Sequence, residues 1–232
     1  MAKPLCIVIH GFTGNPQEVA PVADALTRVG FDVLTPLLPG HYPSRKRMDK
    51  VQSSSWISSI NELLERALDE NREIHIVGFS MGALIAILMG HRHSVQSLVL
   101  LSPAVYVGTP NVFMTRSKQV LRFLRENQSW SKNTLRNQLV SLRAAPLYNV
   151  LQFQKVVREA KKAVPHLRAP ICLIHGLNDE LVDPKSSEWI YQRCASQEKE
   201  LHMLTHSGHL ICHDIEADIL THLVTEFLSR HS

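Results

Sequence analysis

The chain has 232 residues and a mass of 26.2 kDa, with 44% hydrophobic residues, 20% charged residues and a formal net charge of +4. This length and composition suit a single globular domain with a sizeable core. The basic residues form only short groups, which we interpret as solvated surface and not as a nucleic-acid-binding site. The longest apolar stretch, residues 83–90, is far shorter than the ~20 residues of a membrane span.

The N-terminal residues and the cysteines predict a soluble cytoplasmic protein. Only five apolar residues, 5–9, precede His10, too few for the core of a signal peptide. The four cysteines show no CxxC or other metal-type spacing, and reduced thiols are the expected state. They are Cys6, Cys172, Cys194 and Cys212. No metal and no organic cofactor is expected.

The first part of the chain alternates between continuous apolar runs, which predict buried strands, and segments with helical spacing. Strands are expected at residues 5–9, 31–36, 73–79 and 97–102. Helices are expected from Asn15 to Gly30, from Ser54 to Glu70, and from about Ser80 onward. Such alternation predicts a parallel sheet with helices on both faces.

The first of these helices begins with a capping signal. Asn15 is the expected N-cap, and Pro16 suits the first turn. Glu18, three residues after Asn15, is interpreted as the acid that completes a capping box.

The alternation breaks between residues 104 and 168, where only helical patterns occur, and then resumes. A strand is expected at 170–176, a helix after Pro184, a strand at 199–204 and a final helix. We therefore expect a core of residues 1–103 and 169–232 and a helical cap or lid of residues 104–168. Because ligands bind outside the carboxyl ends of the strands in such sheets, the cap is expected to lie over the site.

The sequence GFSMG at residues 78–82 places Ser80 between an apolar strand and a helix. G-x-S-x-G in that context is the nucleophile elbow, a turn so tight that Gly78 and Gly82 cannot carry side chains. The helix N-terminus favours negative charge developing near Ser80. The alternative interpretation is a plain glycine-rich turn in which the serine caps the helix.

A serine nucleophile needs a base, and the base needs an orienting acid; in this fold the chain order is serine, acid, histidine. Asp179, Asp183 and Glu180 follow the strand at 170–176. Asp183 directly precedes Pro184 and is explained as a helix cap, so Asp179 is assigned as the acid.

The histidine is expected in the loop after the last strand. His206, His209 and His213 all lie near that strand's end. Gly208 lets the loop turn the His209 ring inward, so His209 is assigned as the base. The others, among them His10, His75, His91, His93 and His175, are expected to have structural or surface roles.

Two backbone N–H groups are expected to form an oxyanion hole for the tetrahedral intermediate. One belongs to Met81, which follows the nucleophile. The other is assigned to Phe12, in the loop HGFTG at residues 10–14 after the first strand. The alternative interpretation of this loop is an ordinary strand-to-helix turn.

These motifs resemble those of the α/β-hydrolase superfamily, and within it the small bacterial carboxylesterases and bacterial monoacylglycerol lipases. The matching segments are VIHGFTGNPQEV, PLLPGH, VGFSMGA, HGLNDELVDPKSS and SGHLICHDIEADIL. The resemblance implies nucleophile Ser80, acid Asp179, base His209 and oxyanion donors Phe12 and Met81, in agreement with the assignments above. It also implies hydrolysis of short- to medium-chain acyl esters or monoacylglycerols through an acyl-serine.

Two features depart from the family pattern. The antiparallel strands that open larger members have little room before residue 5, so a mostly parallel sheet of about six strands is expected. The cap shows no close motif match, and acyl-chain preference is set there. Candidates to line the acyl pocket, besides Phe12 and Met81, are Val107, Val112, Phe113 and Met114; packing of the lid on the core explains each of these equally well.

Fold alone does not decide function, so rival functions stay open. The same triad serves thioesterases, amidases and carbon–carbon hydrolases, and a non-catalytic small-molecule receptor or an adaptor could keep the fold. The expected partner is a small-molecule ester, with no nucleic acid and no stable membrane insertion. The chain is expected to be a monomer or a homodimer.

Overall fold

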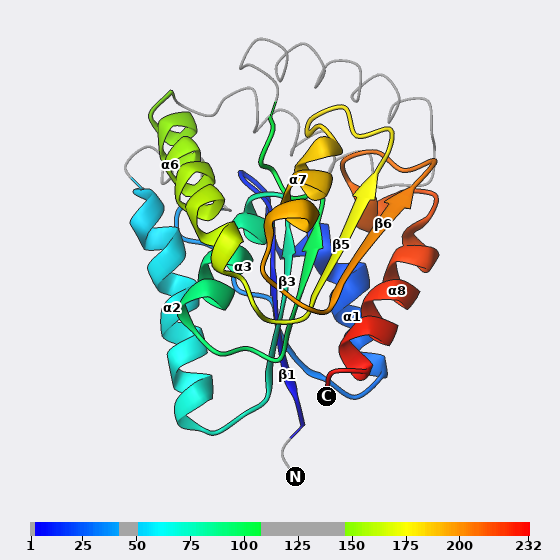
Figure 1. Ribbon diagram of the computed structural model, residues 1–232. Coiled ribbons are helices and arrows are strands. Elements are labelled where there is room, and N and C mark those ends of the chain that lie inside the picture. Colours follow the sequence, from blue (N-terminus) through cyan, green and yellow to red (C-terminus); the bar gives the residue numbers. More distant parts are fainter. Residues whose placement is uncertain (1–2, 42–50, 108–146) are drawn as a thin grey trace.

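The computed structural model describes residues 3–41, 51–107 and 147–232, and it contains a single six-stranded sheet (Figure 1). The strand order is β2-β1-β3-β4-β5-β6, and every neighbouring pair is parallel. The strands are β1 (Leu5–Ile9), β2 (Asp32–Leu34), β3 (Ile74–Phe79), β4 (Ser97–Leu101), β5 (Ile171–Gly176) and β6 (Lys199–Leu204). The predicted parallel α/β sheet is confirmed.

Helices cover both faces of this sheet. The helices are α1 (Ala20–Arg28), α2 (Ser53–Asp69), α3 (Met81–Arg92), α6 (Leu147–Ala163), α7 (Lys185–Arg193) and α8 (Ala217–Ser229). Short 3-10 turns add η1 (Pro16–Val19), η3 (Val164–His166) and η4 (Ile211–His213). α1 and α8 pack on one face, and α2, α3, α6 and α7 contribute to the core on the other.

The core follows from the alternation of side chains along each strand. In β1, Leu5, Ile7 and Ile9 face the cluster shared with α2, α3 and α6, whereas Cys6 and Val8 face α1 and α8. The helix α3 is buried on all sides from Met81 to Met89, because it lies on the sheet between α2 and α6. A helix that is apolar all round is stable only in such a place.

Part of the segment predicted as a cap packs on the core. Phe153, Val156 and Ala160 of α6 are buried in the same cluster as α3. Residues 108–146, the middle of that segment, lie outside the described residues. The cap boundaries at 104 and 168 therefore stay a prediction.

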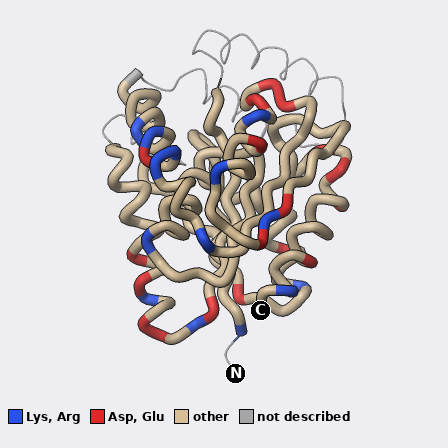
Figure 2. The backbone as a smooth tube through the Cα atoms, viewed as in Figure 1, with Lys and Arg blue, Asp and Glu red and all other residues tan. Residues whose placement is uncertain are grey.

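The two edge strands differ from the strands between them. β2 is shorter than the expected 31–36, because it has one neighbour only and Pro36 follows closely. Charged residues occur in β2 and β6 but in none of β1, β3, β4 and β5 (Figure 2). Charges on edge strands discourage pairing with another chain. Within the described ranges, no helix is long and apolar enough to cross a membrane.

The carboxyl ends of four strands are tied together by backbone hydrogen bonds. Ser80 N–H donates to Leu101 O at 2.9 Å, and Ser102 N–H donates to Ile174 O at 2.9 Å. Asn178 N–H donates to Ser207 O at 3.0 Å. The loops that follow β3, β4, β5 and β6 thus lie side by side at one edge of the sheet, where the candidate residues are found.

Candidate active site

The turn between β3 and α3 holds Ser80 in a strained conformation. Its backbone angles are φ 55° and ψ −111°, a combination that a residue with a side chain rarely adopts. A Cβ on Gly78 would overlap the backbone of Gly82, and a Cβ on Gly82 would overlap the carbonyl oxygen of Ile9. Both glycines are therefore required by close backbone approach, as the nucleophile-elbow interpretation expects.

Three side chains from three loops meet at this edge. His209 Nε2 lies 3.2 Å from Ser80 Oγ, and His209 Nδ1 lies 2.8 Å from Asp179 Oδ2. All three residues are more than nine-tenths buried. With Nδ1–H donating to the carboxylate, Nε2 is left to accept the proton of the serine hydroxyl. The residues assigned from the sequence are brought together in the order that nucleophilic catalysis needs.

Asp179 is held by hydrogen bonds to both of its oxygens. Oδ1 accepts the N–H groups of Leu181 at 2.9 Å and Val182 at 2.8 Å. Oδ2 lies between the two imidazoles of His209 and His175. Burial by itself favours the neutral acid, but the His209 charge and the hydrogen bonds from His175 and His209 outweigh it and hold the pKa of Asp179 well below its usual range. The carboxylate is therefore ionised at neutral pH.

The other two acids in this loop have different surroundings. Asp183 Oδ1 accepts the N–H of Lys185 at 3.0 Å, so Asp183 caps the start of α7, as predicted. Glu180 is half-buried, and burial followed by the charge of Asp179 raises its pKa. Glu180 accepts the backbone N–H of His209, but in the described part of the chain neither carboxylate bonds to a histidine ring.

His175 and Ser187 are site residues that the sequence analysis did not identify. His175 Nε2 lies 3.1 Å from Asp179 Oδ2, and its Nδ1 lies 2.8 Å from Ser187 Oγ. All of these groups are fully or nearly fully buried. The Ser187 hydroxyl can donate to Nδ1, which leaves the Nε2–H to donate to Asp179. The signal in the sequence was the spacing of these two residues. His175 lies near the end of β5 and Asp179 follows four residues later, so the loop can fold back and bring the carboxylate to the ring.

His209 lies among several carboxylates. Burial alone would lower its pKa, but the charge and hydrogen bond of Asp179, followed by the charges of Glu180 and Glu18, raise it. The ring also packs against Phe79, with centroids 5.1 Å apart. The site thus stabilises the imidazolium that forms when His209 takes a proton.

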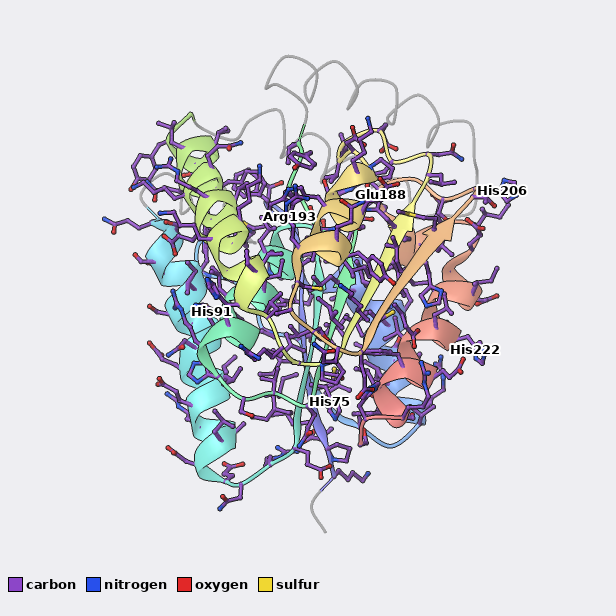
Figure 3. The ribbon with its side chains drawn as sticks, in the orientation of Figure 1. His75, His91, Glu188, Arg193, His206 and His222 are labelled. Carbon is purple, nitrogen blue, oxygen red and sulfur yellow. The ribbon has the colours of Figure 1, made fainter. Side chains whose placement is uncertain are left out.

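The alternative histidines lie elsewhere. His206 is exposed and lies past the end of β6, and His75 and His91 are well separated from it and from each other (Figure 3). His213 Nε2 donates to Gln17 O at 2.9 Å. His10 is buried, and its Nε2 accepts the Leu38 N–H at 3.1 Å, which holds the loop after β2 against β1.

The expected oxyanion donors are free. The backbone N–H groups of Phe12 and Met81 have no acceptor within the described part of the chain. The neighbouring Gly11 N–H is occupied, because it donates to Glu18 Oε2 at 3.0 Å. The Phe12 ring stacks on Phe153 at 5.2 Å and meets Trp56 edge-on at 5.9 Å. Two N–H groups without an acceptor among the described residues, one of them next to Ser80 in the chain, match what an oxyanion hole requires.

The capping-box prediction for Glu18 is wrong. Asn15 does cap η1, accepting the Gln17 N–H at 2.9 Å, but the Glu18 carboxylate reaches Gly11 and not the Asn15 N–H. The first four helical residues form a 3-10 turn, which directs the Glu18 side chain under the HGFTG loop. Sequence spacing alone does not distinguish these two acceptor positions.

The predicted pocket residues are only partly described. Val107 is half-buried, packs on the core and forms an isolated bridge with Val182, whose N–H donates to Asp179. Val112, Phe113 and Met114 lie outside the described residues. The pocket assignment therefore stays a prediction.

One group of potential metal ligands occurs in the described ranges, away from Ser80. Atoms of Cys172, Glu200 and His202 lie within 4.8 Å of one another. Arg230 Nη2 already pairs with Glu200 at 2.7 Å, and His202 Nε2 lies 3.0 Å from the same carboxylate. Burial also raises the pKa of the Cys172 thiol, which disfavours the thiolate that a metal needs. The Glu200 carboxylate is thus already paired, within β6 by His202 and from the end of α8 by Arg230.

A parallel sheet covered on both faces, with a serine on a strained strand-to-helix turn, defines the α/β-hydrolase fold. Residues 1–216 match the family described as serine aminopeptidase, S33, and the chain belongs to this α/β-hydrolase family. The resemblance noted from the motifs is confirmed.

Similar proteins cover nearly the whole chain. A thermostable monoacylglycerol lipase from Bacillus sp. strain H-257 is 25% identical over 227 residues, covering 97% of this chain and 90% of the relative. A carboxylesterase from Bacillus subtilis strain 168 is 20% identical over 225 residues, covering 97% and 92%. A solved structure from work on the metagenome-derived lipolytic enzymes LipS and LipT has a TM-score of 0.77 at 21% identity, covering 99% of this chain and 95% of the other. The sheet and the order of its elements are thus those of a known fold.

Proposed function

We propose that the chain is a serine hydrolase of carboxylic esters, acting on short- to medium-chain acyl esters or monoacylglycerols. Ser80 is the nucleophile, His209 the base and Asp179 the acid that orients it. The observation that carries the proposal is the buried line of hydrogen bonds from Asp179 Oδ2 through His209 to Ser80 Oγ, at 2.8 and 3.2 Å. The lipase and carboxylesterase relatives support an ester as the substrate class.

In the first half of the reaction, His209 Nε2 takes the hydroxyl proton as Ser80 Oγ attacks the ester carbonyl. The carbonyl oxygen becomes an oxyanion and accepts the N–H groups of Phe12 and Met81. The ionised Asp179 stabilises the imidazolium and keeps its Nδ1–H directed at the carboxylate. The alcohol leaves with the proton from Nε2, and an acyl-serine remains.

In the second half, a water molecule takes the place of the alcohol. His209 removes a proton from this water molecule while the water oxygen attacks the acyl carbonyl. The same two N–H groups bind the second oxyanion. Collapse returns the proton to Ser80 Oγ and releases the carboxylic acid. Each step uses groups of this chain and water.

The pKa of His209 sets the pH dependence. His209 acts as a base only when neutral, and its surroundings raise its pKa above the ordinary value of 6.5. We therefore expect kcat/KM to fall as the pH is lowered through that raised pKa, with a midpoint above pH 6.5.

A second candidate is hydrolysis of amides, because the matched family carries the description of an aminopeptidase. An amine is a much poorer leaving group than an alcohol, so His209 must protonate it before the bond breaks. The two substrate classes are separated by comparing a p-nitrophenyl ester with the p-nitroanilide of the same acyl group.

The test is hydrolysis of p-nitrophenyl esters from acetate to palmitate by the wild type, Ser80→Ala and Ser54→Ala. Ser54 is an exposed serine on α2 and serves as the matched control. We expect a chain-length optimum for the wild type and Ser54→Ala, and background rates for Ser80→Ala. Turnover that survives in Ser80→Ala, or none in the wild type, contradicts the proposal.

We also propose a reducing, cytoplasmic location. All four cysteines are buried free thiols, a state that suits such a compartment. The test is to block the thiols in freshly lysed cells under denaturing conditions, isolate this protein and count its blocked cysteines. Four blocked cysteines per chain are expected, and fewer would contradict the proposal.

A further inference from the structure

Glu18 is a buried carboxyl group beside the active site that the mechanism above does not use. It lies in η1 and is only 7% exposed. Its Oε2 accepts the Gly11 N–H at 3.0 Å, and a Cβ on Gly14 would overlap its carboxyl group. The carboxyl group therefore fills the inside of the HGFTG loop and bonds to its backbone.

This contact occupies one amide of the loop and leaves the next one open. The Gly11 N–H is held by Glu18, and the next N–H along the chain, that of Phe12, has no acceptor among the described residues. Thr13 has a positive φ of 62°, so the loop adopts a conformation that needs support from its surroundings. A charged acceptor forms a stronger hydrogen bond than a neutral one, and Glu18 supplies that support.

The same carboxylate acts on the base. Its charge is one of those that raise the pKa of His209. The other titratable groups around it are Cys212 of η4, whose pKa burial and Glu18 raise, and His213, which donates to Gln17 O beside it. The other acids whose charges act on His209 are Asp179 and Glu180. Among the residues that the structure describes, Glu18 is thus the acid that both bonds to the HGFTG loop, called the oxyanion loop below, and acts on the base.

We propose that Glu18 is a positioning residue of the reaction: it holds the oxyanion loop through the Gly11 N–H, and its negative charge stabilises the His209 imidazolium. The inference rests on the proposed function. It goes beyond that function because it links the two halves of the catalytic machinery, the oxyanion donors and the base, through one side chain.

The link has a consequence near neutral pH. Burial raises the pKa of Glu18 to about 7, against which the hydrogen bond from Gly11 and the charge of His209 act. Below that pH the carboxyl group takes up a proton, and both contributions weaken. Above it, the charged form holds the loop and attracts the imidazolium.

Two substitutions separate the hydrogen bond from the charge. Glu18→Gln keeps an oxygen acceptor for Gly11 but removes the charge, and Glu18→Ala removes both. We expect Glu18→Ala to lower kcat by about tenfold to a hundredfold, part of the loss typical of a missing oxyanion donor, with KM within about twofold. Glu18→Gln is expected to stay within about threefold of the wild-type kcat at alkaline pH, and its acid limb moves to lower pH because His209 loses a nearby negative charge.

Glu188→Gln, an exposed change on α7, is the matched control, and we expect it to leave kcat and the pH profile as in the wild type (Figure 3). Wild-type kcat in Glu18→Ala, or an acid limb that does not move in Glu18→Gln, overturns the proposal.

A second measurement needs no turnover. The amide resonance of Gly11 in the 15N-labelled protein is expected to titrate with a midpoint near pH 7, the pKa of Glu18, and not to titrate in Glu18→Gln. A Gly11 resonance that is independent of pH overturns the role of Glu18 even if Glu18→Ala fails to fold. If Gly11 titrates but the wild type cleaves no ester, the proposed function fails and the loop anchor stands.

Discussion

Two turns at the carboxyl edge of the sheet hold their functional side chains in different ways. The turn at residues 78–82 holds Ser80 by close backbone packing, where no Cβ fits at Gly78 or Gly82. The loop at residues 177–184 holds Asp179 by hydrogen bonds, two from backbone N–H groups and two from imidazoles. The first turn requires positions without a side chain, and the second requires hydrogen-bond donors around a carboxylate.

This difference determines how each turn responds to mutation. Repulsion between overlapping atoms rises steeply, so a single added methyl group at the first turn must displace a strand or unwind the turn. Hydrogen bonds are worth about 0.5–1.5 kcal/mol each, or more when charged, and can be lost one at a time. We therefore expect all-or-none effects at the Ser80 turn and graded effects around Asp179, except where the charge of Asp179 itself is removed.

The largest effect is expected for Asp179→Asn. In the wild type each oxygen of Asp179 faces two N–H donors. An asparagine amide has only one oxygen, so in either orientation its NH2 group faces two of these donors and cannot accept from them. His209 also loses the charge that stabilises its imidazolium. We expect kcat for a p-nitrophenyl ester to fall by about a thousandfold or more.

The matched control for that change is Asp183→Asn. Asp183 caps α7, and asparagine caps helices as well as aspartate does, so its kcat is expected to stay near the wild-type value. A variant Asp179→Asn that keeps a tenth of the activity would show that another group orients His209.

The next effect concerns the Ser80 turn. Gly82→Ala is expected to lower the free energy of unfolding by about 3 kcal/mol, because the new Cβ overlaps the backbone carbonyl of Ile9, which cannot move without breaking the sheet. Urea unfolding measures this loss. Gly90→Ala, later in the same helix, meets only the flexible end of Leu98 at 2.6 Å and is expected to cost less than about 1 kcal/mol. Equal losses for the two variants would refute the steric account of the turn.

The smallest effect is expected from Ser187→Ala, which removes the partner of His175 Nδ1. Without that hydroxyl, His175 can place its proton on either nitrogen, and only one of the two tautomers donates to Asp179. We expect kcat to fall by about threefold to tenfold with KM unchanged, the value of about one hydrogen bond.

Ser186→Ala is the control for that measurement. Ser186 is equally buried on α7, but its hydroxyl accepts the Tyr106 N–H and does not touch Asp179 or its histidines. If both variants lose the same activity, packing of α7 explains the loss and the His175 tautomer does not.

Much of the site was accessible from local patterns. Strand, turn and chain order sufficed to choose Ser80, Asp179 and His209, which the structure brings within hydrogen-bonding distance. Patterns of that kind work because parallel strands place their carboxyl ends, and hence their following loops, at one edge. The lining of the acyl pocket stays a prediction: no motif marks its side chains, and Val112, Phe113 and Met114 lie outside the described residues.

Two contacts of buried carboxylates did not follow from spacing, and for Glu18 the expected contact was wrong. Glu18 has the spacing of a capping box, yet its carboxylate bonds to Gly11, because the 3-10 turn rotates it under the loop. A structural role was expected for His175, but its partner was not: it shares Asp179 Oδ2 with His209. A residue type and its spacing do not specify which of several nearby donors a buried carboxylate will reach.

The sequence by itself determined the alternation of strands and helices, the parallel sheet and the glycines of the Ser80 turn, because periodicity and steric limits act between near neighbours along the chain. Only the tertiary structure decided how the buried polar groups pair. It linked Ser187 through His175 to Asp179, and it bonded Glu18 to Gly11 of the oxyanion loop. Burial requires each such group to find a partner, and the packing of the strands and loops determines which partner is within reach.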